Sequence, residues 1–181
     1  ALRRALAISP SWGTASRRLS ECLERGGNFT ESRAVLEAAV AKAPLDAVTH
    51  GYLADTLWRT CEKTLALERV KTALRLNPAY DWAWRSLRAW AEELNQPQAP
   101  VNLAREIVAQ RGGDAQSWLA LARVLPSTPE TLNERLDVLD RVLTLAPAND
   151  DAADLRAVLL ANAGRFAEAE AACNMPVWAG R

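Results

Sequence analysis

The sequence is poor in the residue types that catalytic and metal sites require. Its 181 residues include a single histidine, His50, and only three cysteines, Cys22, Cys61 and Cys173. The cysteines form no CxxC pair, and no cluster of histidine, cysteine or carboxylate has the spacing of metal ligands. The two glycine pairs lack the flanking pattern of a phosphate-binding loop. The sequence therefore predicts no enzyme, no metal site and no cofactor in this segment.

The chain also lacks net charge and long apolar runs. Its 22 basic and 22 acidic residues give a formal net charge of zero. Because nucleic acids and anionic membranes attract basic surfaces, the sequence predicts neither as a partner. No apolar run approaches the ~20 residues that cross a bilayer, and the first residues do not resemble a signal peptide. The three thiols cannot all be paired internally, which predicts a reducing compartment, the cytoplasm.

What the sequence does have is a regular spacing of helix-breaking residues. Pro10, Pro44, Pro78, Gly112 and Pro147 follow one another at intervals of 34, 34, 34 and 35 residues. A period of this length is typical of antiparallel helix pairs that stack on one another, because each pair is too small to bury its apolar face alone. The spacing therefore predicts an all-α repeat protein without strands.

Each predicted repeat contains two amphipathic helices. Leu53 and Leu57 lie one turn apart in an opening helix, and Ala66, Val70 and Ala73 follow with helical spacing in the helix that covers it. We expect the repeats to form a single array over residues 1–181. Because the chain opens inside a repeat and without a starting methionine, we expect this array to belong to a larger protein. Its predicted units are a half repeat at 1–12 and repeats at 13–46, 47–80, 81–114, 115–149 and 150–181.

The residues between the helices support this division. Gly27, Asn95 and Gly164 fall between the two helices of their units, and all three are residues that tolerate the left-handed conformation of a helix cap. Ser11 and Asp46 precede opening helices and are predicted to cap them. These turn and cap residues indicate where each helix begins and ends.

The segment 155–169 resembles the tetratricopeptide repeat, with Gly164, Phe166 and Ala169 at the positions typical of that family. The phased units extend the resemblance over the whole chain. It implies a right-handed superhelical solenoid of antiparallel helix pairs, and a non-catalytic scaffold that binds a protein or an extended peptide in its concave groove. Nothing in the resemblance identifies the partner.

The same resemblance predicts the partner-binding residues, because positions on the opening helices line the groove in tetratricopeptide proteins. Aromatic side chains provide rigid anchors, and arginine and aspartate provide stacking and ion pairing for a peptide. The predicted binding residues are Arg17, Tyr52, Asp55, Trp58, Arg59, Trp82, Arg85 and Arg123. The alternative for each is that it packs on a neighbouring repeat or is merely solvated.

Other aromatic residues are predicted to be structural. Trp84 and Trp118 match the family's packing position, and Trp90 matches a further apolar position. His50 stands where Trp84 and Trp118 stand in later units, so we expect a packed interior histidine. The carboxylate clamp that binds acidic chaperone tails requires lysine and asparagine at groove positions that hold other residues here, which argues against a chaperone-tail adaptor.

The sequence also gives expectations for the three cysteines and for two unusual turns. Cys22 and Cys173 are expected to fill apolar positions, whereas Cys61, at a turn, is expected to be exposed. Two proline-rich turns, 96–100 and 126–129, depart from the repeat pattern. They are either tolerated loop variation or a dedicated contact edge, and both readings stay open.

Several functional alternatives also stay open. The chain can be the substrate-recruiting or regulatory arm of a larger enzyme, such as a peptide glycosyltransferase or a protease. The segment 77–85 resembles the repeat of the protein prenyltransferase α-subunit, although only one unit shows this. The chain ends are poorly capped, which leaves self-association open. Arginine outnumbers lysine by 19 to 3, as in GC-rich genomes, and this composition favours a bacterial source.

Overall fold

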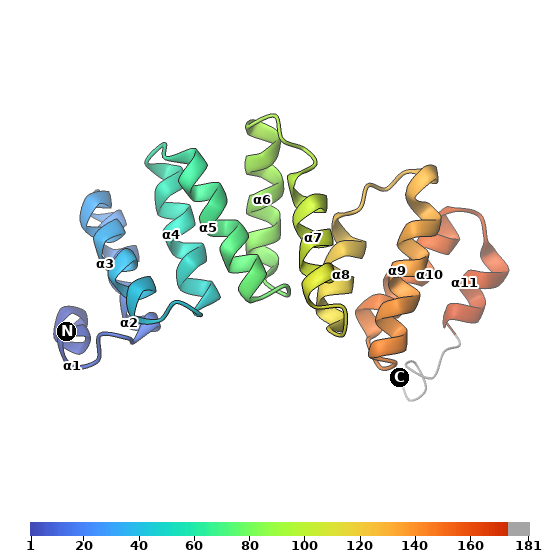
Figure 1. Cartoon of the computed structure of the whole chain (residues 1–181), viewed down its shortest axis with the longest axis horizontal. Helices are drawn as coiled ribbons and strands as arrows, with labels where there is room; N and C mark the ends of the chain where they lie inside the picture. Colours follow the sequence, from blue (N-terminus) through green and yellow to red (C-terminus); the bar gives the residue numbers. More distant parts are fainter. Residues whose placement is uncertain (174–181) are drawn as a thin grey trace. The chain divides into compact units, whose positions relative to one another are not determined.

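The computed structural model describes residues 1–173, which form helices joined by short turns with no strand among them (Figure 1). They divide into two compact units, Ala1–Ala99 and the part of the chain from Pro100 onward. The helices of the first unit are α1 (Leu2–Ile8), α2 (Gly13–Arg25), α3 (Phe29–Lys42), α4 (Ala47–Arg59), α5 (Lys63–Leu76) and α6 (Asp81–Glu93). From Ala99 onward follow α7 (Ala99–Gln110), α8 (Ala115–Val124), the 3-10 helix η1 (Pro129–Thr131), α9 (Leu132–Leu145), α10 (Asp150–Asn162) and α11 (Phe166–Cys173).

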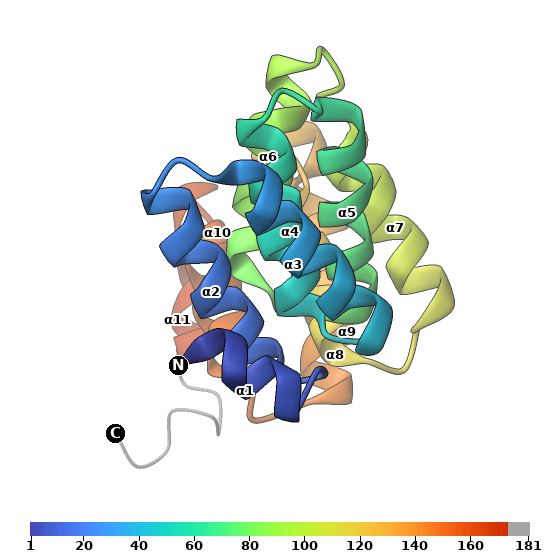
Figure 2. The same cartoon turned by 90° about the vertical axis from the view of Figure 1, so that its left-hand side faces the viewer.

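In the first unit two opening helices pack against the helices that follow them. α2 packs on α3 and α4 packs on α5, and α3 also contacts α4, so the hairpins stack. Figure 2 looks onto this unit and shows α2 to α5 beside one another. Leu36, Leu53 and Leu74 come from three successive helices and are fully buried between them. The apolar stripes of neighbouring hairpins thus build one continuous core.

The second unit repeats this arrangement. α8 packs on α9, α9 on α10, and α10 on α11. Leu119, Leu139 and Leu160, from α8, α9 and α10, are its fully buried leucines. The predicted all-α class and the stacking of antiparallel helix pairs are therefore confirmed.

The opening helices start at regular positions. α2, α4, α6, α8 and α10 begin at Gly13, Ala47, Asp81, Ala115 and Asp150, the residues at which the predicted repeats also begin. The regular recurrence follows from the turn chemistry, because residues that interrupt a helix, such as Gly27, Pro44 and Pro78, recur at the turns.

The turns between paired helices have the predicted left-handed residues. Gly27, Asn95 and Gly164 have φ angles of +77°, +54° and +74°. Cys61 takes the same place in its hairpin with a φ of +65°, although its Cβ makes this conformation unfavourable. The turn geometry is thus kept where the residue type is not.

The caps of the opening helices follow the prediction at one position and depart from it at another. Asp46 caps α4, since its carboxylate accepts hydrogen bonds from the backbone N–H groups of Val48 and Thr49. The prediction that Ser11 caps α2 is wrong. The N-cap residue is Trp12, and no side chain caps this helix end. The chain enters α2 one residue later than a serine cap requires.

One hydrogen bond recurs at the same place in three opening helices. Trp84 Nε1 donates to the carbonyl of Pro78 at 2.8 Å, and Trp118 Nε1 donates to the carbonyl of Gly112 at 2.9 Å. His50 Nε2 contacts the carbonyl of Pro44 at 3.0 Å across the same six-residue interval. A carbonyl only accepts, so Nε2 carries the proton. The expected interior histidine is confirmed, and its role is to fasten the preceding turn.

His50 is expected to make stability depend on pH. It is 3% exposed, and its Nδ1 has no hydrogen-bond partner among the described residues. Burial lowers its pKa, with Arg69 adding to the effect and the Pro44 carbonyl and Asp46 opposing it. The unfolded chain therefore binds the proton more readily. The contribution of His50 to the free energy of unfolding is fully present above the pKa that His50 has in the unfolded chain. It is lost as the pH falls below that pKa, by at most about 1.4 kcal/mol per pH unit.

The measurement is chemical denaturation between about pH 7 and pH 5.5, where an ordinary histidine titrates. His50→Gln removes the titrating group, so its free energy of unfolding is expected to change less over this range than that of the wild type. If the free energy of unfolding changed equally with pH in the wild type and in His50→Gln, the pH dependence would belong to other groups.

The expectation for two of the cysteines is wrong. Cys22 and Cys173 are exposed, as Cys61 is, and all three are free thiols. Cys22 lies on a part of the α2 surface that its neighbours leave uncovered, and Cys173 is the last residue of α11. Helical spacing alone placed them on a packed face, but burial also depends on how far the neighbouring helix extends.

Candidate functional site

α4 is the central opening helix of the first unit, and one of its faces contacts α2. Thr49, Tyr52, Thr56 and Arg59 lie three, four and three residues apart, a spacing that places them on one stripe of the helix. Each makes a side-chain contact with a residue of α2. This stripe joins the two opening helices through polar contacts.

Arg17 is held at one end of this stripe. Its Nη1 donates to Asp46 Oδ2 at 2.7 Å and to Thr49 Oγ1 at 2.9 Å. Burial disfavours the Asp46 carboxylate, but the hydrogen bonds from Thr49 and the charge of Arg17 outweigh it and lower the pKa of Asp46. A Cβ at Gly13 would lie 2.3 Å from Asp46 Oδ2, so the glycine leaves the space that this ion pair occupies. Arg17 thus ties α2 to the start of α4.

Tyr52 continues the stripe. Its hydroxyl donates to Glu21 Oε1 at 2.8 Å, while Arg18 donates to the other oxygen of Glu21 at 2.9 Å. These two hydrogen bonds lower the pKa of Glu21, and the bond to Glu21 raises the pKa of Tyr52. The phenol ring is therefore held in one orientation while Tyr52 remains half-buried.

At the other end of the stripe, the Glu24 carboxylate accepts hydrogen bonds from three side chains. Its Oε1 accepts hydrogen bonds from Ser32 Oγ at 3.0 Å and from Thr56 Oγ1 at 2.6 Å. Arg59 donates to the other carboxylate oxygen and lies over the ring of Phe29, 4.9 Å from its centroid. Arg59 is thus engaged within the unit by an ion pair and by a ring contact.

The face of α4 toward α6 is aromatic. Trp58 stacks on Trp90 with ring centroids 4.5 Å apart and planes inclined by 7°. Trp82 meets Trp90 edge to face at 6.1 Å, and Tyr80 lies 5.7 Å from Trp82. Lys63 adds a cation 5.2 Å from the Trp58 ring centroid. The four rings form one aromatic cluster, Trp58, Tyr80, Trp82 and Trp90, between α4 and α6.

A pocket of about 300 Å³ opens beside this cluster. It is lined by Gly51, Tyr52 and Asp55 of α4 and by Tyr80 and Trp82 at the start of α6. A Cβ at Gly51 would lie 2.7 Å from the Tyr80 hydroxyl oxygen, so only glycine lets the tyrosine ring lie against α4. We call this the aromatic pocket.

Asp55 is the charged residue of the aromatic pocket. Burial raises the pKa of its carboxyl group, and the nearby Glu24 raises it further, while Arg59 opposes the shift. The contact from Arg59 Nη1 to Asp55 Oδ2 is 3.9 Å, too long for a hydrogen bond. Arg59 is instead hydrogen-bonded to Glu24, so Asp55 retains the capacity to accept a cation from outside.

The structure brings three of the eight predicted binding residues together, namely Tyr52, Asp55 and Trp82 in the aromatic pocket. The other five lie elsewhere. Arg17 and Arg59 are in ion pairs within the first unit, Trp58 is stacked on Trp90, and Arg85 is exposed on α6. Arg123 belongs to the second unit, where its Nη2 donates to Asp151 at 3.0 Å.

Sequence reasoning missed two residues of the pocket, Gly51 and Tyr80. Each carried a signal. A glycine inside a helix costs stability relative to alanine, so Gly51 indicated a close approach by another group. Tyr80 stands two residues before Trp82 at the helix entrance, where a ring can reach back over the preceding opening helix.

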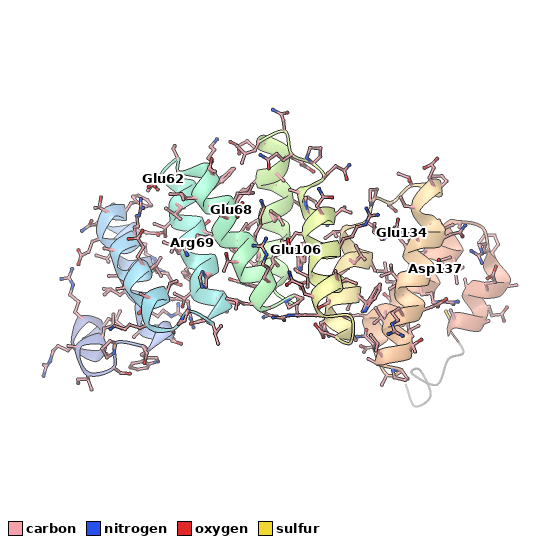
Figure 3. All side chains as sticks on the ribbon, viewed as in Figure 1. Glu62, Glu68, Arg69, Glu106, Glu134 and Asp137 are labelled. Atoms are coloured by element: carbon pink, nitrogen blue, oxygen red, sulfur yellow. The ribbon has the colours of Figure 1, made fainter. Side chains whose placement is uncertain are left out.

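The surface of α5, the helix that follows α4 in its pair, differs from the aromatic face of α4. Figure 3 labels Glu62 just before α5, and Glu68 and Arg69 within it. This helix carries none of the predicted binding residues. Glu62 accepts a hydrogen bond from Arg33, and Glu68 pairs with Lys71 at 2.8 Å. Ion pairs at the surface are typical of a solvated face and contribute little to stability. The recessed aromatic site lies on the opening helices instead.

Within residues 1–173, no group of three or more histidine, cysteine or carboxylate side chains is placed to hold a metal ion. Over the same residues, no helix is both long enough and apolar enough to cross a membrane.

Stacked helix pairs with a recessed pocket on two opening helices define a helical repeat protein, and comparison with solved structures identifies the fold. YrrB, described as a tetratricopeptide repeat protein with an unusual peptide-binding site, is 16% identical, with a TM-score of 0.52 over 97% of this chain and 92% of its own. MamA from Desulfovibrio magneticus RS-1 is 16% identical, with a TM-score of 0.51 over 88% of this chain and 90% of its own.

A third similar structure is that of Naa15 with Naa10, bound to HypK. It is 18% identical, with a TM-score of 0.52 over 94% of this chain and 32% of the other. No protein-family model and no curated protein matches the sequence. At these identities the likeness concerns the fold, and the chain has the tetratricopeptide repeat fold.

Proposed function

We propose that this chain is a non-catalytic scaffold that binds a protein or an extended peptide segment through the opening helices of its first unit. The observation that carries the proposal is the aromatic pocket, with Tyr52, Tyr80 and Trp82 around the Asp55 carboxylate. A recessed site with aromatic walls and a single charged group is typical of an anchor pocket. The fold that this chain shares with peptide-binding YrrB supports the same function. We also propose a cytoplasmic location, because the three cysteines are free thiols.

We infer that the anchor is a lysine side chain of the partner. Ring faces attract an ammonium group, and a partly desolvated carboxylate gains more from a cation than an exposed one does. Asp55 supplies this charge. Arg17, Trp58 and Arg59 are engaged in internal contacts, so we propose that they hold the helices that carry the pocket.

A positional-scanning library of immobilised peptides tests this function. Wild-type protein is expected to prefer lysine at one position of the bound peptides. Asp55→Asn is expected to weaken binding of the selected peptide about tenfold, which corresponds to about 1.4 kcal/mol. Trp82→Ala is expected to weaken it by a similar or larger factor, since it removes one wall of the pocket.

The matched control is Glu92→Gln, which removes one negative charge from an exposed position of α6. This variant is expected to bind as the wild type does. Circular dichroism must first show that all variants melt like the parent protein. A wild-type protein that selects no lysine, or an equal loss in Asp55→Asn and Glu92→Gln, would contradict the proposal.

A further inference from the structure

The second unit contains a buried arginine. Arg135 of α9 is 7% exposed. Its Nε donates to the carbonyl of Ala122 at 3.3 Å, and its Nη1 donates to Ser127 Oγ at 2.9 Å. Both partners are neutral. A guanidinium almost always remains charged, so the site holds a buried positive charge.

Arg135 stands where three other helix pairs have a small residue. It is the fourth residue of α9, and Ser32, Ala66 and Ala169 are the fourth residues of α3, α5 and α11. All three are buried and small enough to let paired helices cross closely. The turn before α9 is also longer: residues 125–131 separate it from α8 and include η1. The arginine and the longer turn both border a pocket that extends to α10.

No counter-charge compensates Arg135 within the part of the chain that the structure describes. No carboxylate there lies within ion-pair distance, and Nη2 donates no hydrogen bond to residues 1–173. Burial lowers the pKa of the guanidinium, and no neighbouring charge contributes. A buried cation without an anion costs several kcal/mol, and a bound anion would recover part of that cost.

The space beside Arg135 is a pocket of about 390 Å³. Ser127, Thr128 and Asn162 contribute polar groups to its wall, and Leu132 and Leu159 contribute apolar ones. The Ser127 oxygen accepts from Arg135, which leaves the hydroxyl proton available to another acceptor. The pocket therefore offers one positive charge and hydrogen-bond donors next to apolar surface.

We propose that this pocket binds a carboxylate carried on an apolar group, with Arg135 as its ion-pair partner. A monoanion matches the single positive charge, and the two oxygens of a carboxylate match a guanidinium with donors still unused. Leu132 and Leu159 provide the surface for the apolar part. The site lies within the second unit, so it is independent of the aromatic pocket.

Such a carboxylate can come from two sources. One is the C-terminus of a protein segment, and the other is a small organic acid. The test uses N-acetylleucine and its amide as probes of the wild-type protein, by titration calorimetry at constant ionic strength. The acid is expected to bind one to one, and the amide at least about tenfold more weakly, because it lacks the charge. Equal binding of acid and amide, or no heat of binding from the acid, would overturn the proposal.

A heptapeptide with C-terminal leucine, compared as free acid and as amide, distinguishes the sources. A free acid that binds about tenfold more tightly than N-acetylleucine supports a protein C-terminus as the ligand. Equal affinities support a small organic acid. Each of these results retains the carboxylate site.

Arg135→Met tests the assigned residue against Arg141→Met, which removes an exposed arginine from the same helix. We expect Arg135→Met to lose acid binding and to melt no lower than the wild type, because an uncompensated buried charge is removed. Arg141→Met is expected to bind normally. Binding that survives in a folded Arg135→Met variant overturns the assignment. If this variant does not fold, the comparison of acid and amide on the wild type decides.

Discussion

Replacing Trp90 by alanine is expected to lower the free energy of unfolding of the first unit by about 3–5 kcal/mol. The indole is 7% exposed and stacks on Trp58 with centroids 4.5 Å apart. Its second ring contact is edge to face with Trp82 at 6.1 Å. Alanine removes both contacts and leaves a cavity, which close-packed helices cannot fill by a small shift.

Urea denaturation followed by far-ultraviolet circular dichroism measures this change. The matched control is Trp12→Ala, since Trp12 is 51% exposed and an exposed substitution is expected to change stability by no more than about 0.5 kcal/mol. Near-ultraviolet circular dichroism of the Trp90 variant should also lose intensity from the stacked indoles. Equal destabilisation by the two substitutions would show that the aromatic cluster contributes nothing specific.

Replacing Glu24 by alanine is expected to destabilise the first unit by about 2–3 kcal/mol. Its carboxylate is the hydrogen-bond acceptor for the hydroxyls of Ser32 and Thr56, which are 0% and 1% exposed. Without Glu24, Thr56 still donates to the carbonyl of Tyr52 at 3.1 Å, but the Ser32 hydroxyl loses its partner. A buried hydroxyl without a partner retains its full desolvation cost.

Thermal or urea unfolding of three variants separates these effects. Glu24→Gln keeps an acceptor oxygen for Ser32, so it is expected to lose less stability than Glu24→Ala. Glu37→Ala removes an exposed carboxylate that pairs with Arg33 on the same helix, and it should cost less than about 1 kcal/mol. If Glu24→Ala and Glu37→Ala lost the same free energy of unfolding, the hydrogen bonds of Glu24 would stabilise the protein no more than a surface ion pair does.

Much of the fold could be predicted because its signals are local. The residue types at Gly27, Asn95 and Gly164 indicate left-handed turns wherever they stand, and the structure confirms all three. The failures concern surfaces that depend on neighbours. Ser11 has the right chemistry for a cap but does not lie at the helix end, and Cys22 is exposed on its helix.

The candidate site was predictable only in part. Tyr52, Asp55 and Trp82 follow from the resemblance to a repeat family, which places them on the opening helices. Gly51 and Tyr80 required the structure, because their contact joins residues 29 positions apart in the chain. Arg135 shows the same limit. Its position in the repeat can be read from the sequence, but only the packed side chains show that it has no counter-ion within residues 1–173.

The sequence by itself determined the repeat period, the helical class and the turns, because each rests on the conformational preference of one residue or of a few neighbours. Only the tertiary structure decided which side chains became pockets. Tyr80 lies against α4 because Gly51 leaves it room, and Asp55 stays available because Arg59 is drawn to Glu24. Such outcomes depend on competition between groups far apart in the sequence, and that competition is settled only when the helices pack.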